Sequence, residues 1–432
     1  MSGATDPAQA ASADDNTPPP IIRKVANRIM WWLIALYFVA ILDRGNVAYA
    51  AVPMSQALGL STAMFGFGVG IMYLTYSLFE VPSNMMLARF GARLTLTRIA
   101  VLWGLCTTAL AAVWSAESFY VLRAILGAAE AGLFPGVMLY LTFWFPVAYR
   151  ARYNAMFNFA VPAAYIFGSV ISGAILAMDG IAGIAGWRWL FLLEGLPAVL
   201  LGIACHFLLS DGPKDAKWLN ADEKAWLEAQ LTPAHPHSAG TFSALAKPEV
   251  WLLAMCNFGL FTGLLTVSVW LPQIFHAQGL GFGITGVLTA VPALGGIAGM
   301  YWFSRRSDRK KERFGHAAGA FLLAASGFVI AAYGTGSTTQ TLIGFAVANA
   351  GVLATQAIFW TIPQSYLPRA SAPVAIGMIA MLGSLGGAVA PLIIGWIKDE
   401  TGGFFWGFVV NALVFCAAAA LIYAIRGRFE RR

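Results

Sequence analysis

The sequence predicts an all-α polytopic membrane protein with twelve transmembrane helices in two six-helix halves. Of its 432 residues, 59% are hydrophobic and 11% are charged, whereas roughly 25% of the residues of soluble domains are charged. A membrane-spanning helix takes about 20 apolar residues, so twelve of them occupy about 240 positions, slightly more than half of this chain. Strands of a membrane barrel would alternate in polarity over about ten residues. The long continuous apolar runs of this chain favour helices instead.

Twelve apolar segments along the chain are long enough to cross a bilayer. We expect an N-terminal bundle over 29–209 and a C-terminal bundle over 249–425. Residues 1–28, rich in Ala, Ser, Asp and Pro, predict a disordered cytoplasmic tail, and residues 426–432 form a short basic tail. The segments lie near 30–52, 65–87, 94–114, 119–143, 154–178, 189–209, 249–275, 284–304, 316–334, 338–362, 374–397 and 404–425.

The placement of basic residues predicts the orientation of these helices. With a cytoplasmic N-terminus, 23 of the 27 Lys and Arg residues fall in cytoplasmic segments, and only Arg188 and Lys398 fall on the opposite side. By the positive-inside rule, both termini are expected in the cytoplasm of a multi-pass protein of the cell inner membrane. The net charge of +7 therefore reflects topology. It does not indicate nucleic-acid binding, which needs basic residues clustered on a soluble face. We expect the protein to be a monomer.

One polar insert, residues 210–248, divides the helices six and six and predicts a cytoplasmic linker loop. Asn220 and Glu223 have the spacing of a capping box, and they precede an amphipathic helix that bears Trp226 and Leu227. A basic turn follows both the second and the eighth span, which indicates that the two halves are related. Two such halves predict transport by rocking around a site at the membrane midplane.

Of the charged residues inside the predicted spans, four are the main candidates: Asp43, Arg44, Arg123 and Glu130. Each intramembrane charge costs on the order of 2.5–3.5 kcal/mol. Arg123 and Glu130 are seven residues apart and so share one helix face, as expected of two groups lining one polar cavity. The side chains of Asp43 and Arg44 diverge by about 100°, so each is expected to face a different neighbour. The arginines suit a carboxylate substrate, and the acids suit proton transfer. Fixed ion pairs between neighbouring helices are the structural alternative.

Other polar residues near the spans are weaker candidates. Glu80 lies near a helix end, and Glu194 is expected to brace two helices. No metal role is expected for the lone histidines His206, His276 and His316. The glycines of 281–286 match a dinucleotide fingerprint by spacing, but no strand precedes them. We therefore expect that the protein is not an enzyme and binds no cofactor, and that its transport is coupled to an ion gradient.

With these residues in view, the chain from Arg28 to Ile425 resembles the major facilitator superfamily and, within it, the anion:cation symporter family. The resemblance implies the major facilitator fold and proton-driven uptake of a small organic anion such as tartrate, phthalate, hydroxyphenylacetate or a sugar acid. The motifs that carry it are LDRGNVA at 42–48, FEVPSN at 79–84, RFGAR at 89–93, RAILGAAEAGLFPG at 123–136, WFP at 144–146 and GWRWLFLLEG at 186–195.

The resemblance also implies roles for individual residues. Arg44 and Arg123 would contact the substrate carboxylate, and Asp43 and Glu130 would carry protons. Tyr76 would lie against the substrate. Further residues implied by the resemblance are Trp360 and Ser384 on the wall of the second half, and Arg89, Gly91, Arg93, Asp308 and Arg309 in the two basic turns.

The chain departs from the family pattern at a few positions. Ala88 stands where many members have Asp, so an acidic partner for the basic turns is expected only in the second half, as Asp308. Ser384 and Ala380 stand where sugar-acid carriers often have Asn, which favours a less hydroxylated ligand. An aromatic or short aliphatic acid could pack against the aromatic residues Phe359, Trp360, Tyr366 and Trp270.

Three other functions remain open at this stage. A proton-coupled efflux antiporter of the same architecture is one, although two intramembrane arginines would repel cationic drugs. A non-transporting nutrient sensor is another, but such sensors usually have a long soluble extension. Sodium coupling would need clustered oxygen ligands, which the sequence does not show.

Overall fold

The computed structural model describes residues 18–231, 247–366 and 372–430. Within these ranges the chain is helical apart from short turns. Of the disordered tail predicted over 1–28, residues 1–17 lie outside the described residues. The prediction is wrong for 20–28, which are helical from Pro20 on, because Ile22 and Val25 are buried in the core of the first half. Residues 232–246 of the linker and Arg369 also lie outside the described residues. The helices are α1 Pro20–Leu58, α2 Thr62–Phe90, α3 Ala92–Leu110, α4 Ala116–Glu130, α5 Leu133–Thr142, α6 Val147–Asn158, α7 Ala160–Leu176, α8 Gly186–Leu208, α9 Ala221–Gln230, α10 Pro248–Ala277, α11 Phe282–Lys310, α12 Phe314–Gly334, α13 Thr338–Phe359, α14 Thr361–Tyr366, α15 Ala372–Thr401 and α16 Phe405–Glu430.

Apart from α9, which lies in the central loop, these helices form the twelve predicted membrane spans. Three spans consist of two helices each, namely α4 with α5, α6 with α7 and α13 with α14, and each of the other nine is one helix. Among the described residues, eleven spans are long and apolar enough to cross a membrane. The twelfth is α3, whose mean hydropathy is lowered by Arg93 and Arg98. The central loop contains α9, and its capping box is present: Asn220 Oδ1 accepts from the backbone N–H of Glu223 at 2.7 Å.

The break between α4 and α5 lies directly after Glu130. Ala131 leaves the helical conformation with ψ 133°, and Gly132 has φ 88° and ψ 1°. That conformation is in the left-handed region, which glycine adopts at little steric cost. Glu130 is therefore the last residue of α4 and lies at a discontinuity in the fourth span.

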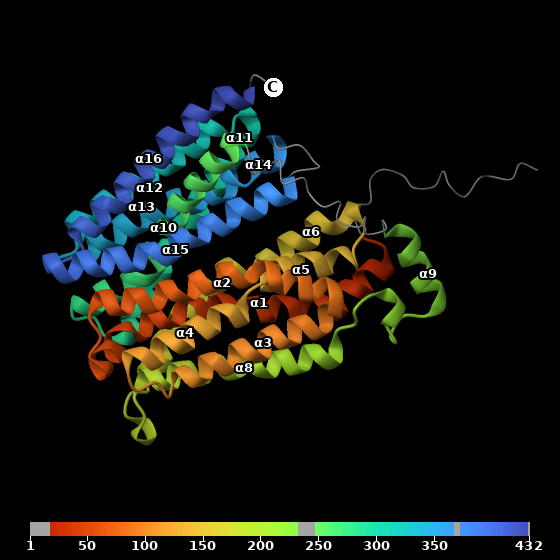
Figure 1. The fold of residues 1–432 in the computed structure, drawn as a ribbon, viewed down its shortest axis with the longest axis horizontal. Coiled ribbons are helices and arrows are strands. Elements are labelled where there is room, and N and C mark those ends of the chain that lie inside the picture. Colours follow the sequence, from red (N-terminus) through yellow and green to blue (C-terminus); the bar gives the residue numbers. More distant parts are fainter. Residues whose placement is uncertain (1–17, 232–246, 367–371, 431–432) are drawn as a thin grey trace, which may run out of the picture.

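Figure 1 shows the two halves as two bundles, with α1–α8 in red to green below and α10–α16 in green to blue above. We call the side where α1 begins and α16 ends the termini side, and the other side, with the turns at Gly59, Gly279 and Gly402, the far side. The ribbons of the two halves meet on the far side and diverge toward the termini side, where α6, α9 and α14 lie (Figure 1).

Glycines on the far side let helices of the two halves approach closely. α2 packs along α15, and α7 packs along α11. A Cβ atom on Gly66 would lie 2.2 Å from the carbonyl oxygen of Pro391, and one on Gly70 would lie 2.1 Å from that of Ala388. Likewise, a Cβ on Gly286 would lie 2.4 Å from Ser169 O. Small residues are the usual means of close helix packing in membranes, so this face of the bundle interface is tightly closed.

A carboxylate reinforces the same contact. Asp399, near the end of α15, accepts hydrogen bonds from the backbone N–H groups of Thr62 and Ala63 at 3.0 and 2.7 Å. These groups lie at the N-terminus of α2, which attracts negative charge. On the termini side, by contrast, α5 and α6 pack against helices of the first half, and α14 packs against α13 and α15.

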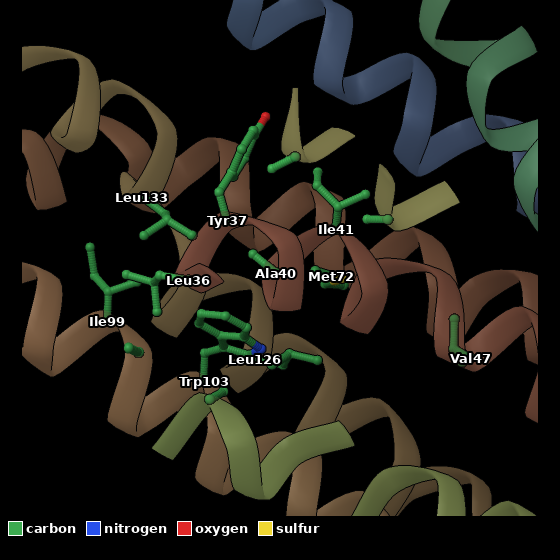
Figure 2. Close-up of a cluster of buried hydrophobic side chains, with 14 of the residues drawn as sticks. Leu36, Tyr37, Ala40, Ile41, Val47, Met72, Ile99, Trp103, Leu126 and Leu133 are labelled. Carbon is green, nitrogen blue, oxygen red and sulfur yellow. The ribbon is translucent and has the colours of Figure 1, made fainter. Parts of the chain in front are cut away.

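The buried apolar residues form two clusters that reflect this asymmetry. One cluster fills the first half and continues on the far side into the second half through residues such as Trp270 and Phe404. The other is confined to the second half. Figure 2 shows part of the first cluster, where Trp103 of α3 lies among Leu36, Ile99 and Leu126. The two halves therefore share one apolar core on the far side, whereas toward the termini side the second half has a core of its own.

Candidate functional site

The centre of the first half contains a buried ion pair between α1 and α4. Arg44 Nε lies 2.6 Å from Glu130 Oε1. The Glu130 side chain is fully buried, whereas 24% of the Arg44 side chain is exposed. The Arg44 guanidinium also lies over the ring of Tyr76 in α2, 5.1 Å from its centroid. Arg44 Nη2 and Glu130 Oε2 have no hydrogen-bond partner among the described residues. The pair thus retains one free donor and one free acceptor.

A second arginine lies on the same face of α4, two turns before Glu130. Arg123 is 1% exposed, and its Nε donates to the carbonyl oxygen of Gly68 in α2 at 3.1 Å. Its terminal nitrogens Nη1 and Nη2 have no partner among the described residues. Leaving a buried charged donor without a partner costs more than leaving a neutral one unpaired. The two terminal nitrogens of this guanidinium are therefore buried donors that an anion entering the site could satisfy.

Asp43 faces away from Arg44 and toward α3. Its Oδ2 accepts from Trp103 Nε1 at 2.9 Å and from Thr107 Oγ1 at 3.0 Å. Its Oδ1 accepts from Asn46 Nδ2 at 2.8 Å. Asp43 and Asn46 are both 1% exposed. Three donors directed at one carboxyl stabilise its charged form.

The structure places the residues predicted for the second half away from this group. Trp360 lies at the junction of α13 and α14, half-buried, with its ring edge against Phe359. The hydroxyl of Ser384 donates to Ala380 O in its own helix at 3.2 Å. One turn later, a Cβ on Gly387 of α15 would lie 3.4 Å from the ring of Tyr73 in α2. Neither Trp360 nor Ser384 has a contact with Arg44 or Arg123 among the described interactions.

Of the aromatic residues suggested for ligand packing, Trp270 does not support that role. Trp270 is fully buried and packs between Phe65 and Phe404, with ring centroids 6.3 and 5.3 Å away. It therefore belongs to the closed contact on the far side. The side chain of Tyr366 lies outside the described residues.

The basic turn after α2 has an acidic partner that the sequence did not reveal. Gly91 has φ 85°, and a Cβ there would lie 2.5 Å from Asp211 Oδ1. That oxygen accepts from the backbone N–H of Arg93 at 2.9 Å, and Arg93 Nε lies 3.9 Å from Asp211 Oδ2. The expectation that only the second half has such a partner is wrong, because Asp211 is brought to the turn from 118 residues away.

In the second half, the acidic residue of the basic turn pairs within the turn itself. Asp308 binds Arg313, and Arg309 is exposed in the last turn of α11. Glu312 accepts from the backbone N–H groups of Gly315 and His316 at 2.6 and 3.1 Å, and so caps α12. In the first half, Arg89 lies over the ring of Phe90, 5.4 Å from its centroid.

Several site residues were missed from the sequence alone. Trp103 and Thr107 are four residues apart and share one face of α3, so their polar atoms were a possible signal in an otherwise apolar span. Nothing local indicates that this face would meet Asp43, because the two helices are far apart in sequence. Gly68 was also missed, since it contributes only a backbone carbonyl oxygen.

Comparison with known proteins gives concordant matches over most of the chain. A family model described as "Major Facilitator Superfamily" matches residues 33–391. A relative from Agrobacterium vitis named "Putative tartrate transporter" is 42% identical over 410 residues, covering 94% of this chain and 91% of the relative. Another, the "Quinolone resistance transporter" of Acinetobacter baumannii, is 36% identical over 418 residues, covering 95% of this chain and 96% of the relative.

A solved structure shares the fold. It is that of a bacterial homologue of the human lysosomal transporter Spinster, in an inward-facing and occupied conformation. The TM-score is 0.78 at 16% sequence identity, and the match covers 96% of this chain and 99% of that chain.

Proposed function

Since the chain belongs to the Major Facilitator Superfamily and is a membrane transporter, we propose that it is a proton-coupled symporter that imports a small organic carboxylate across the inner membrane. The observation that carries this proposal is the pair of arginines at the centre of the first half. Among the described residues, both terminal nitrogens of Arg123 are unpartnered, and Arg44 pairs with Glu130 while lying over the ring of Tyr76. A planar guanidinium matches a carboxylate with two parallel hydrogen bonds.

The ion pair between Arg44 and Glu130 links substrate binding to protonation. While Glu130 is charged, it competes with a substrate carboxylate for Arg44. A proton on Glu130 removes the charge that holds the arginine, so the guanidinium becomes available to the substrate. Protonation of Glu130 therefore favours substrate binding to Arg44, and substrate binding favours protonation of Glu130. Such reciprocal coupling is the thermodynamic requirement for linking two ligands.

Charge balance supports the same mechanism. Two arginines and two acids, Asp43 and Glu130, give the site no net charge without substrate. One carboxylate entering with one proton leaves that balance unchanged. Moving a net charge through apolar surroundings is costly, so we expect one proton for each substrate carboxylate, and two for a dicarboxylate.

The orientation proposed from the basic residues makes the termini side cytoplasmic. The far side, which faces the periplasm in this orientation, is closed by the glycine contacts and by Asp399. The conformation is then one that opens inward. Alternating access requires these contacts to break when the carrier opens outward.

The substrate class draws on the relatives as well as on the site. The relative named for tartrate supports a short hydroxylated dicarboxylate, and Ser384 in place of an amide favours few hydroxyl groups. We therefore place short hydroxy and dicarboxylic acids first, and aromatic acids and sugar acids after them.

Purified protein in proteoliposomes tests the proposal. Uptake of labelled tartrate and of a panel of carboxylates is measured with and without an inwardly directed proton gradient, together with counterflow exchange at equal pH. Glu130→Gln is expected to abolish accumulation driven by the proton gradient and to leave exchange measurable. If the variant still concentrates substrate against its gradient, Glu130 has no coupling role.

Efflux of an anionic compound is the second candidate, because one relative is named for quinolone resistance. The same two arginines would bind such an anion, so the geometry of the site does not distinguish import from efflux. Transport in right-side-out and everted vesicles does separate them. Carboxylate accumulation only in everted vesicles would favour efflux over import.

A further inference from the structure

A second buried carboxyl group lies beside Asp43 and takes no part in the mechanism proposed above. Glu194 of α8 is 3% exposed. Its Oε1 accepts from the hydroxyl of Ser172 in α7 at 2.8 Å, and its Oε2 has no partner among the described residues. Asn46 of α1, which donates to Asp43, also faces the Glu194 carboxyl. The four residues form one buried polar cluster that joins three helices.

The backbone around this cluster is closely packed. Gly195, next to Glu194, lies so near α3 that a Cβ atom would be 2.7 Å from the backbone nitrogen of Thr108. On α3, a Cβ on Gly104 would be 2.7 Å from the backbone nitrogen of Val199 in α8. The position of the Glu194 carboxyl is therefore set by the contact between two rigid helices.

The two carboxyl groups have opposite surroundings. Asp43 accepts three hydrogen bonds from N–H and O–H donors, which suits an anion. Glu194 has one hydroxyl donor, and in the described part of the chain no Lys or Arg pairs with it. α8 packs against α1, α3 and α7. The charged group of these helices that faces Glu194 is Asp43; Arg44 of α1 pairs with Glu130 instead, and the other Lys and Arg residues of α1 and α3 lie near the ends of these helices on the termini side. α7 has no Asp, Glu, Lys or Arg over Ala160–Leu176. A buried unpaired anion is costly, and more so beside a second anion.

We propose that Glu194 is a neutral carboxylic acid that positions Asn46, and through Asn46 the carboxyl group of Asp43, for which the family resemblance implies a role in carrying protons. In this proposal, the single O–H donor of a protonated Glu194 is directed at the side-chain oxygen of Asn46. Fixing that oxygen turns the amide N–H of Asn46 toward Asp43 Oδ1. Ser172 completes the arrangement by donating to the other oxygen of Glu194. Glu194 is thus a positioning residue that retains its proton while Asp43 exchanges its own.

Transport measurements as a function of pH test the positioning role and rest on the proposed function. A glutamine also has an N–H donor and a carbonyl acceptor, so Glu194→Gln is expected to retain the wild-type pH profile and at least half of the uptake rate. Glu194→Ala removes the donor to Asn46, so Asp43 loses an oriented hydrogen bond to its charged form. We expect the pH midpoint of uptake to rise by about one unit in this variant.

A double-variant comparison separates positioning from a general loss of stability. Asn46→Ala is expected to raise the pH midpoint as much as Glu194→Ala, and the double variant no further, since both act on one hydrogen bond. Ser169→Ala is the matched control, because it removes another buried hydroxyl of α7, one that donates to Ile166 O in its own helix. Additive shifts in the double variant, or an equal shift in Glu194→Gln, would overturn the proposal.

Infrared spectroscopy tests the protonation state without any transport. The wild-type protein at neutral pH is expected to show the carbonyl-stretch band of a protonated, buried carboxylic acid, and Glu194→Gln is expected to lose it. If the band is present but uptake shows no pH dependence, proton coupling fails while the neutral Glu194 stands. If Glu194→Gln retains the whole band, the neutral acid is excluded whatever drives transport.

Discussion

At the level of single side chains, the guanidinium of Arg123 has more donors than partners. Nε donates to Gly68 O, whereas the two buried terminal nitrogens have no partner in the part of the chain that the structure describes. Arg44 differs, because Glu130 already occupies part of its guanidinium. Arg123 is thus the arginine that is ready for an anion before any proton arrives, and Arg44 is the one whose availability depends on protonation.

Replacing this arginine by lysine tests that distinction. Arg123→Lys keeps the positive charge but loses the fork of two nitrogens, so one charged hydrogen bond to the substrate is lost. We expect the substrate Kd to rise roughly 10- to 100-fold, measured by isothermal titration calorimetry. Arg188→Lys is the matched control, since Arg188 donates to carbonyl oxygens of Ala111 and Val113 in a turn on the far side. An unchanged Kd in Arg123→Lys would contradict a substrate contact.

At the level of helices, carboxylates from outside the helix cap the N-termini of α2, α3, α8 and α12 in the described part of the chain. Asp399 caps α2, Asp211 caps α3, Asp179 caps α8 and Glu312 caps α12. Partial burial raises the pKa of Glu312, but hydrogen bonds from Gly315 and His316 outweigh it and hold that pKa below its usual range. The stabilisation by Glu312 is therefore present above the pKa of an unfolded glutamate and is lost as the pH falls.

The close approach of α2 and α15 gives a prediction at the same scale. Gly66→Ala adds a Cβ that would lie 2.2 Å from Pro391 O, so the far side cannot close fully. We expect an engineered cysteine at Thr285, which is buried on that side, to react with a maleimide about tenfold faster in a background without the four native cysteines. Gly377→Ala is the control, because a Cβ on this glycine of α15 meets nothing within 4 Å. Equal labelling rates in Gly66→Ala and Gly377→Ala would show that α2 and α15 accommodate the added methyl group while the far side remains closed.

For the whole molecule, the two halves are held together on one side by apolar packing and by one charged cap. The hydrophobic cluster of the first half continues into the second half on the far side, whereas the second cluster remains within its own half. Asp399 belongs to the second half and caps a helix of the first. In the proposed alternating-access cycle, these far-side contacts are present in this conformation and absent from the one open on the far side, so they bias the equilibrium between the two.

Asp399→Asn is expected to shift that equilibrium. The amide retains one acceptor but loses the negative charge at the N-terminus of α2, and such charges contribute about 0.3–1 kcal/mol. The population open on the far side should rise about two- to fivefold, measured by electron–electron distance spectroscopy with spin labels on the two halves. The neighbouring variant Glu400→Gln removes an exposed charge without a described contact at this helix end. The same shift in both variants would assign the effect to net charge and not to the cap.

Most of the architecture follows from local sequence, since hydropathy over about 20 residues decides whether a segment crosses a membrane. Twelve spans, two halves and the set of intramembrane charges were all predictable in this way. The divergence of Asp43 from Arg44 was predictable too, because it depends only on helix geometry. The membership in the superfamily agrees with the motifs from which it was expected.

Only the tertiary structure decided which groups meet. Arg44 pairs with Glu130 across 86 residues, and Asp43 with Trp103 across 60. Asp211 supplies the partner that the turn after α2 lacks locally. The physical reason is that hydropathy and helix periodicity act over a few turns of one segment, whereas an ion pair depends on which helices pack side by side and in which register. The placement of the charges in the spans is therefore a property of the sequence, and their pairing is a property of the fold.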